Sequence, residues 1–376
     1  MNTTQKDLLF LLCCAVNRLD PKPERVRAMD LEELYRISKF HSVRAAVCIV
    51  LERAGIRHEK FHDAYKKSVR KNIYHDLERT AILAEFEKQD IWYLPLKGII
   101  LKEIYPENGM REMSDNDILY DAKKQQAVKQ IMVGRGYKVK YIDSGHDDVY
   151  TKPPVLNFEM HTSLFGVGHS EVFNRYYTNV KRLMIKDSEG SFGYHLSDED
   201  FYVFMTAHEY KHYSKGGTGI RSLLDCYVFI KHTQDTMDMA YISEQCKKLG
   251  ISDFENKRRA LAIKIFSKPT LPPLTVEEQE MLRYYLGSGV FGTVENSIRK
   301  SLSEKSRVRY VMGNLFPSLE YTKRSVGFVK KCPVLYPFGI IYRWIRVVLR
   351  RRNYLSAIIK VMKKDHPNKS SDHRRE

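Results

Sequence analysis

Residues 111–121 read REMSDNDILYD, a polar segment that runs into three large apolar residues. This pattern predicts a β-strand that carries two acids, Asp115 and Asp117. Side chains alternate along a strand, so residues two apart project from the same face. Two carboxylates held this close repel each other unless a cation lies between them. Mg²⁺ binds one or two carboxylates together with substrate phosphates, so the stretch indicates a site for metal and phosphate.

The flanking sequence fits such a site. Residues 91–105, IWYLPLKGIILKEIY, form a short apolar run that meets Lys97 and Gly98 and then resumes helical spacing. A glycine lets the backbone approach phosphates, and Lys97 and Arg111 are cations that can clamp them. Glu159 lies in a later predicted strand, NFEMH, where we expect it to join the two aspartates across the sheet.

Two carboxylates joined by a third suit two-metal phosphoryl transfer, in which one ion activates a hydroxyl and the other holds the triphosphate. The D-x-D pair by itself is a weak motif, because a solvated strand end with two unrelated acids has the same pattern. The Lys-Gly pair upstream and the acid downstream favour the functional interpretation.

The order of predicted elements gives an α+β fold class, with a mixed sheet between two helical subdomains. The predicted segments are a helical subdomain at 1–90, an α/β unit at 91–196, a second helical subdomain at 197–362 and a disordered polar tail at 363–376. Within the second subdomain we expect helices at about 219–232, 237–249, 254–267 and 275–287.

One long helix is predicted in the first subdomain from an apolar repeat. Its members recur at every fourth position, which places them on one stripe, and they are Phe61, Tyr65, Val69, Ile73 and Leu77. The other positions of this segment are rich in Lys, Arg and Asp, so we expect the stripe to be the buried face.

The net charge indicates the kind of partner that the protein binds, and the cysteine content indicates its compartment. The formal net charge of the 376 residues is +17, which favours phosphate-bearing partners without saying which. The six cysteines form no C-x-x-C pair, so the sequence indicates a reducing cytoplasm rather than a disulfide framework. The run LLFLLCCAV at 8–16 predicts a buried helix rather than a signal peptide, because Asp7 precedes it and no small-residue cleavage site follows.

The C-terminal run PFGIIYRWIRVVLRRRNYL at 337–355 is too charged to cross a membrane, since Arg343 and Arg346 interrupt it. It predicts a basic amphipathic helix. Such a helix can lie peripherally on an anionic membrane, bind RNA or pack as the last helix of the fold, and all three remain open here.

A second motif, HEYKH at 208–212, has the spacing of a zinc protease. His208 and His212 would share one face of a helix, with Glu209 beside them as general base. The extended form of that motif needs Gly at 215 and His at 218, where the chain has Lys215 and Thr218. The missing third ligand makes a metalloprotease the weaker alternative.

Six segments in order resemble the uncharacterised bacterial nucleotidyltransferase-like family of the DNA polymerase β superfamily. They are KFHSVRAAV at 39–47, LPLKGIILKEIYPENGMREMSDNDILYD at 94–121, FEMHTSL at 158–164, HEYKH with IRSLLD at 208–225, NLFPSLEY at 314–321 and YRWIRVVLRRR at 342–352. The resemblance covers about residues 5–350. It implies a nucleotidyltransferase fold for the α/β unit.

The resemblance also implies roles for single residues. Asp115, Asp117 and Glu159 match the positions that hold Mg²⁺ or Mn²⁺. The positions that bind the nucleoside triphosphate are matched by Lys97, Gly98 and Arg111, and further nucleotide-site positions by His161, His212 and Arg221. The implied reaction moves a nucleoside monophosphate to an acceptor hydroxyl on a small molecule or sugar, a tRNA or a protein.

One residue departs from the superfamily pattern. The position after Gly98 usually carries a hydroxyl or a second glycine, and here it is Ile99. This leaves a second hypothesis, a protein that keeps the fold and binds nucleotides or other polyanions without turnover.

Overall fold

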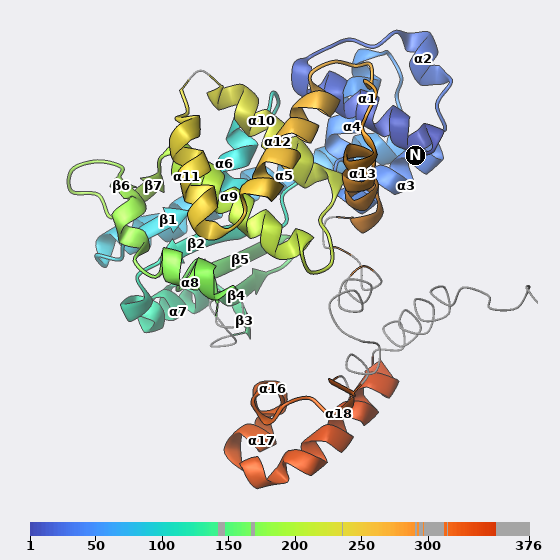
Figure 1. Cartoon of the computed structure of the whole chain (residues 1–376). Helices are drawn as coiled ribbons and strands as arrows, with labels where there is room; N and C mark the ends of the chain where they lie inside the picture. Colours follow the sequence, from blue (N-terminus) through green and yellow to red (C-terminus); the bar gives the residue numbers. More distant parts are fainter. Residues whose placement is uncertain are drawn as a thin grey trace, which may run out of the picture. The chain divides into compact units, whose positions relative to one another are not determined.

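The computed structural model describes residues 1–141, 147–166, 170–234, 236–289 and 315–350, together with 292, 296, 312 and 313 (Figure 1). Its contacts divide the chain into two compact units. The first comprises 1–211 and 219–290, and the second comprises 212–218 and 291–376. The predicted tail at 363–376 lies outside the described residues, and the predicted segment boundaries stay a prediction.

The first ninety residues are helical, as predicted. The helices are α1 (Thr3–Asn17), α2 (Pro23–Arg27), α3 (Leu31–His41), α4 (Arg44–Arg53) and α5 (Glu59–Lys88). A capping box between Asn2 and Gln5 starts α1, and Leu8 to Val16 are all buried in it. The prediction of a packed first helix is therefore confirmed.

The long helix α5 buries a different stripe from the predicted one. Phe61 is fully buried, but Ile73 and Leu77 are 46% and 64% exposed. A strict four-residue repeat advances roughly 40° per step on a helix of 3.6 residues per turn, so it winds away from the core. The buried residues of α5 are Phe61, Ala64, Ser68, Asn72, His75, Ile82 and Phe86, a stripe that is polar in its middle.

A mixed five-stranded sheet forms the centre of the first unit, which confirms the α+β class. Its order is β1 (Tyr93–Pro95), β2 (Asn116–Tyr120), β5 (Leu156–His161), β4 (Asp147–Lys152) and β3 (Lys138–Tyr141). The β2–β5 pair is parallel and the other three pairs are antiparallel. A two-stranded sheet of β6 (Met184–Lys186) and β7 (Tyr194–Leu196) lies beside β1.

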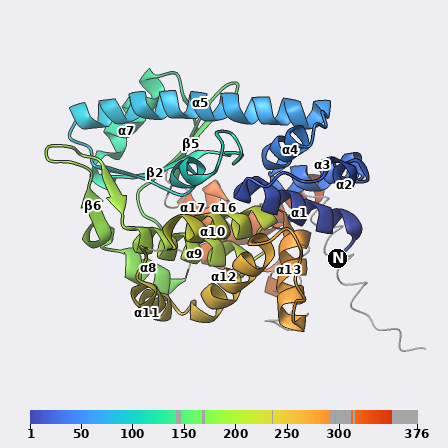
Figure 2. The same ribbon diagram turned by 90° about the horizontal axis from the view of Figure 1, so that it is seen from above.

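One face of the large sheet packs on α5 and α7 (Gln125–Gly134). Ile118 and Tyr120 of β2 and Phe158 of β5 share a buried cluster with Phe86 of α5 and with residues of α7. Figure 2 shows α5 running along one side of β2 and β5 while α9, α10 and α12 lie on the other side. Because side chains alternate, the intervening residues of β2 and β5 project from the face opposite to α5.

The helices after the sheet follow the predicted order. They are α8 (Glu171–Tyr177), α9 (Asp198–Tyr213), α10 (Ile220–Thr233), α11 (Met239–Leu249), α12 (Ser252–Phe266) and α13 (Val276–Ser288). The second unit contains α16 (Leu319–Ser325), α17 (Gly327–Lys331) and α18 (Tyr336–Arg350). Across the described ranges, no helix combines the length and the apolar composition needed to cross a bilayer.

Candidate active site

Three side chains with metal-binding atoms converge on the sheet face opposite to α5. Asp117 of β2 and Glu159 of β5 are direct partners in the parallel register, so their carboxylates project side by side. His161 lies two residues further along β5, and its Nε2 is 2.8 Å from Oδ1 of Asp117. The ligand atoms of all three residues lie within 4.8 Å of one another. This arrangement can hold one cation between two neighbouring strands.

Asp115 lies just before the sheet, because β2 begins at Asn116. It is therefore beside the group of Asp117, Glu159 and His161 rather than within it. Burial and the nearby Asp117 carboxylate raise the pKa of Asp115 to about 6. The same causes, with Asp115 added, raise the pKa of Glu159 to about 8. Both carboxyl groups thus ionise less readily than usual because they are buried and lie among other carboxylates, and a bound cation would favour their ionised forms.

The cation closest to this group is Lys97, whose Nζ lies 2.6 Å from Oδ1 of Asp117. Burial acts to raise the pKa of Asp117, but Lys97 and the hydrogen bond from His161 outweigh it and hold that pKa below its usual range. Lys97 adopts a positive φ of 51°, which is uncommon for a side chain of its size. Strained backbone of this kind is found most often at functional sites.

Gly98 follows at the start of the short helix α6 (Gly98–Leu101). A Cβ on Gly98 would lie 2.7 Å from Nη1 of Arg111 and 3.0 Å from the end of Met113. The glycine is therefore needed for close packing against the segment that leads into β2. Ile99, the residue that departs from the superfamily pattern, is buried in the cluster beneath the sheet.

Arg111 is engaged in a buried ion pair rather than directed at the carboxylate group. Its Nε and Nη2 donate to the two oxygens of Asp225 in α10 at 2.8 and 2.9 Å. The hydroxyl of Tyr105 donates to Asp225 as well, at 2.7 Å. This bidentate pair fastens the segment before β2 to α10.

Further contacts fix the same segment to the N-terminal helices. Glu112 accepts hydrogen bonds from Arg44 at 2.6 Å and from the backbone of Ala45 at 3.2 Å, both in α4. Arg221 of α10 donates to the carbonyl of Glu112 at 2.9 Å. Burial lowers the pKa of Arg221, and the neighbouring Arg111 lowers it further. The structure thus brings Arg221 near Asp115 but joins it directly to the backbone.

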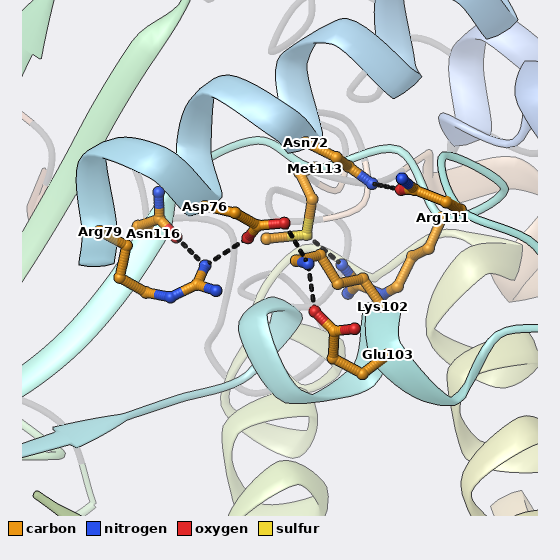
Figure 3. Close-up of polar contacts among 9 residues, drawn as sticks. Asn72, Asp76, Arg79, Lys102, Glu103, Arg111, Met113 and Asn116 are labelled. Carbon is orange, nitrogen blue, oxygen red and sulfur yellow. Dashed lines mark hydrogen bonds and ion pairs between the residues drawn. The ribbon is translucent and has the colours of Figure 1, made fainter. Parts of the chain in front are cut away.

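A polar cluster on α5 holds the start of β2 (Figure 3). Asp76 bridges Arg79 at 2.8 Å and Lys102 at 2.9 Å, and Arg79 also donates to Oδ1 of Asn116 at 3.2 Å. Asn116 immediately precedes Asp117, so this cluster positions the metal-binding strand. The sequence did not lead us to these residues. The polar residues on the buried stripe of α5 are the sequence signal that could have revealed this cluster.

In the HEYKH motif, the acid takes part in a buried ion pair. Glu209 is buried in α9, where it accepts a hydrogen bond from the hydroxyl of Tyr285 at 2.7 Å and pairs with Arg258 at 3.3 Å. Burial raises the pKa of Glu209 despite the opposing influence of Arg258. His212 belongs to the second compact unit, whereas the carboxylate group lies in the first.

The possible metal groups within the described residues include neither His208 nor His212. A second such group consists of Cys48, Glu52 and His62, where α4 meets α5. In that group, Nδ1 of His62 lies 2.6 Å from Oε1 of Glu52.

The fold is thus an α+β protein whose mixed sheet carries two acids on adjacent parallel strands, beside a Lys-Gly turn. The chain belongs to the family described as uncharacterised nucleotidyltransferase, which matches residues 27–267. The resemblance noted in the sequence is confirmed at the level of this family, which implies a nucleotide substrate. The comparisons with curated proteins and with solved structures give no match.

Proposed function

We propose that the protein transfers a nucleoside monophosphate from a nucleoside triphosphate to an acceptor hydroxyl, with Mg²⁺ or Mn²⁺ held by Asp117, Glu159 and Asp115. The observation that carries this proposal is the parallel register that places Asp117 beside Glu159. All three donors are carboxylates, the ligand type that hard divalent cations prefer. A bound divalent ion would lower the pKa of the acceptor hydroxyl and neutralise charge on the phosphates.

The roles of the chain's own residues follow from their positions. Lys97 binds the phosphates, and the backbone at Gly98 approaches them closely. His161 holds the Asp117 carboxylate in place through its hydrogen bond. The acceptor oxygen bonds to the α-phosphorus, the bond from that phosphorus to the bridging oxygen breaks, and pyrophosphate leaves. Glu159 takes the proton of the hydroxyl as the general base.

Thermal unfolding with each of the four NTPs, with and without Mg²⁺ or Mn²⁺, tests the site without knowledge of the acceptor. A ligand that binds the folded state raises the unfolding midpoint as its sites fill. We expect a metal-dependent rise with at least one NTP that is lost in Asp117→Asn. The matched control is Asp63→Asn, an exposed acid on α5 that should keep the full rise. No rise with any NTP and metal in the unaltered protein would refute the proposal.

A non-catalytic nucleotide or polyanion binder is the competing function, and Ile99 is the residue that suggested it. Its burial in the core gives the missing hydroxyl a packing explanation, so Ile99 does not favour the binder. Pyrophosphate release separates the two functions. A transferase loses this release in Asp117→Asn, while a polyanion binder releases none and loses affinity steeply with added salt.

Three acceptor classes are compatible with the reaction, namely a small molecule or sugar, a tRNA and a protein. Incubation of the protein with an NTP labelled at the α-phosphate and with each class separately identifies the acceptor. Label in one class, absent with Asp117→Asn, is the expected result.

We place the protein in the cytoplasm, with peripheral contact to an anionic membrane through the segment 315–350. Apolar side chains are exposed on and before α18, among them Val334, Phe338, Ile341, Tyr342, Trp344 and Ile345. Glu320 is the single acidic residue in this stretch of sequence, where Lys and Arg are frequent. Exposed apolar and aromatic side chains together with positive charge favour a lipid surface over RNA.

Vesicle sedimentation tests this contact. We expect binding to phosphatidylcholine vesicles that contain phosphatidylserine and weak binding to vesicles that lack it. Phe338→Ser should reduce the bound fraction, whereas Val276→Ser, an equally exposed apolar position in the first unit, should not. Retention by RNA with no retention by vesicles would contradict the membrane contact.

A further inference from the structure

Two cationic side chains from different helices flank the segment that leads into Asp115. Lys71 of α5 donates from Nζ to the carbonyl of Ser114 at 2.7 Å. Arg221 of α10 donates from Nη1 to the carbonyl of Glu112 at 2.9 Å. Both side chains are partly exposed, so each has N–H groups available beyond this one hydrogen bond.

These two cations differ from the others around the site in forming no ion pair within 4.0 Å among the described residues. Lys97, Lys102 and Arg111 each form an ion pair within 4.0 Å. Within the part of the chain that the structure describes, neither Lys71 nor Arg221 forms one. Burial lowers the pKa of Lys71, Asp115 opposes this effect, and Arg221 adds a smaller lowering. An anion between these two cations could accept charged hydrogen bonds from both of them.

Both side chains are held in place by neighbours on their own helices. Arg221 lies one helical turn before Asp225, so the two share a face of α10, and the Arg111–Asp225 pair fixes that face. On α5, Ser68 donates to the carbonyl of Gly109 at 2.7 Å, which fastens the turn before Lys71 to the same segment. A preorganised pair of cations binds an anion with little loss of side-chain freedom.

We propose that Lys71 and Arg221 bind the β- and γ-phosphates of the nucleoside triphosphate, and that Arg111 is a positioning residue that fixes the α10 face carrying Arg221 by pairing with Asp225. This inference rests on the proposed function, because it places the triphosphate tail beside Asp115. It brings a residue of the N-terminal helices into the nucleotide site. It also assigns the phosphate contact to Lys71 in place of Arg111, whose guanidinium Asp225 already neutralises.

Calorimetric titration with Mg²⁺ and either an NTP or the corresponding NMP tests the assignment. The nucleotide is the one that gives the largest thermal shift with the unaltered protein. Loss of one charged hydrogen bond weakens binding roughly ten- to a hundredfold. We therefore expect Lys71→Gln and Arg221→Gln to weaken NTP binding by that factor and to leave NMP binding nearly unchanged.

Three further variants make the outcome specific. Lys67→Gln removes an exposed lysine one turn earlier on α5 and should bind as the unaltered protein does. Lys71→Arg keeps the charge and should restore most of the affinity. Arg111→Lys loses the bidentate geometry, so its loss of affinity should appear with the NTP and not with the NMP. If Lys71→Gln does not fold, Arg221→Gln provides the same comparison from the other helix.

The results separate this inference from the proposed function. Unchanged NTP affinity in both Lys71→Gln and Arg221→Gln, when the unaltered protein binds, would overturn the assignment and leave the transferase proposal standing. Equal weakening of NTP and NMP binding would also overturn it, because the β- and γ-phosphates would then not be the contacted groups. No NTP binding by the unaltered protein would overturn both.

Discussion

Buried acids occur in two motifs of this chain that suggest catalysis, and the charges around the acids distinguish the motifs. In HEYKH, Glu209 faces one fully buried cation, Arg258, and accepts a hydrogen bond from Tyr285. At the SDNDILY motif, Asp117 lies beside Glu159 of the neighbouring strand with Asp115 next to them, and Lys97 is the nearest cation. The first group is balanced internally, as a structural ion pair must be. The second has three carboxyl groups close together, and the pKa values of Asp115 and Glu159 are raised, which is expected where an external cation binds.

The largest effect should come from breaking the balanced pair. Glu209→Gln leaves Arg258 buried without an anion, and a guanidinium cannot shed its charge by losing a proton. We expect the free energy of unfolding to fall by about 3 kcal/mol, within the range for a broken buried ion pair. Urea denaturation measures this loss.

The control for that measurement is Glu189→Gln, an exposed glutamate that should change stability by less than about 0.5 kcal/mol. Asp117→Asn is the informative comparison. It removes one of several crowded carboxylates, so it should cost less than Glu209→Gln. An equal or larger loss in Asp117→Asn would show that the carboxylate group is a structural ion pair too.

A smaller effect should appear as a pH dependence of the metal-free protein. The folded-state pKa of Glu159 is about 8, above its ordinary value of 4.5. Its contribution to stability is therefore complete below about pH 4.5 and is lost as the pH rises through 8. The raised pKa of Asp115 acts in the same direction. The buried histidines His41 and His75 have lowered pKa values and are neutral in the folded and unfolded states above about pH 7. We therefore expect the unfolding midpoint to fall by a few degrees between pH 7 and 8, on the order expected for about 1 kcal/mol.

One substitution and one ligand should each remove this pH dependence. Glu159→Gln cannot ionise, so its midpoint should stay nearly level over the same pH range. Mg²⁺ or Mn²⁺ should flatten the curve of the unaltered protein, because a bound cation favours the ionised carboxylates. A metal-free protein that becomes more stable as the pH rises through this range would contradict the raised pKa of Glu159.

The sequence predicted the strands that carry the site residues better than it predicted the contacts of those residues. Strand alternation and the separate NFEMH strand were sufficient to anticipate that Asp117 and Glu159 share one face of the sheet. Lys71 was missed because a lysine on a long basic helix resembles a solvated residue. It is recognisable only once the buried stripe of α5 is known to contain Ser68 and Asn72.

Arg111 is the converse case, a residue that the sequence analysis named but whose partner it did not reveal. An arginine four residues before an acid pair is a reasonable phosphate ligand by sequence, but its partner Asp225 lies more than a hundred residues away, in α10. Long-range ion pairs of this kind leave no local pattern. The same holds for Glu209, whose partners Arg258 and Tyr285 come from α12 and α13. The motif suggested a general base, whereas the partners make it part of the core.

The smallest expected effect concerns zinc. Because the side chain of Glu209 is engaged with Arg258 and Tyr285, we expect no zinc at HEYKH and no change in stability or nucleotide binding on treatment with a zinc chelator. Elemental analysis of the purified protein, with His208→Ala as the comparison, measures this directly. Stoichiometric zinc that disappears in His208→Ala would reverse the distinction between the two motifs. Zinc that persists in His208→Ala and is lost in Cys48→Ser would instead lie at Cys48, Glu52 and His62, and HEYKH would remain part of the core.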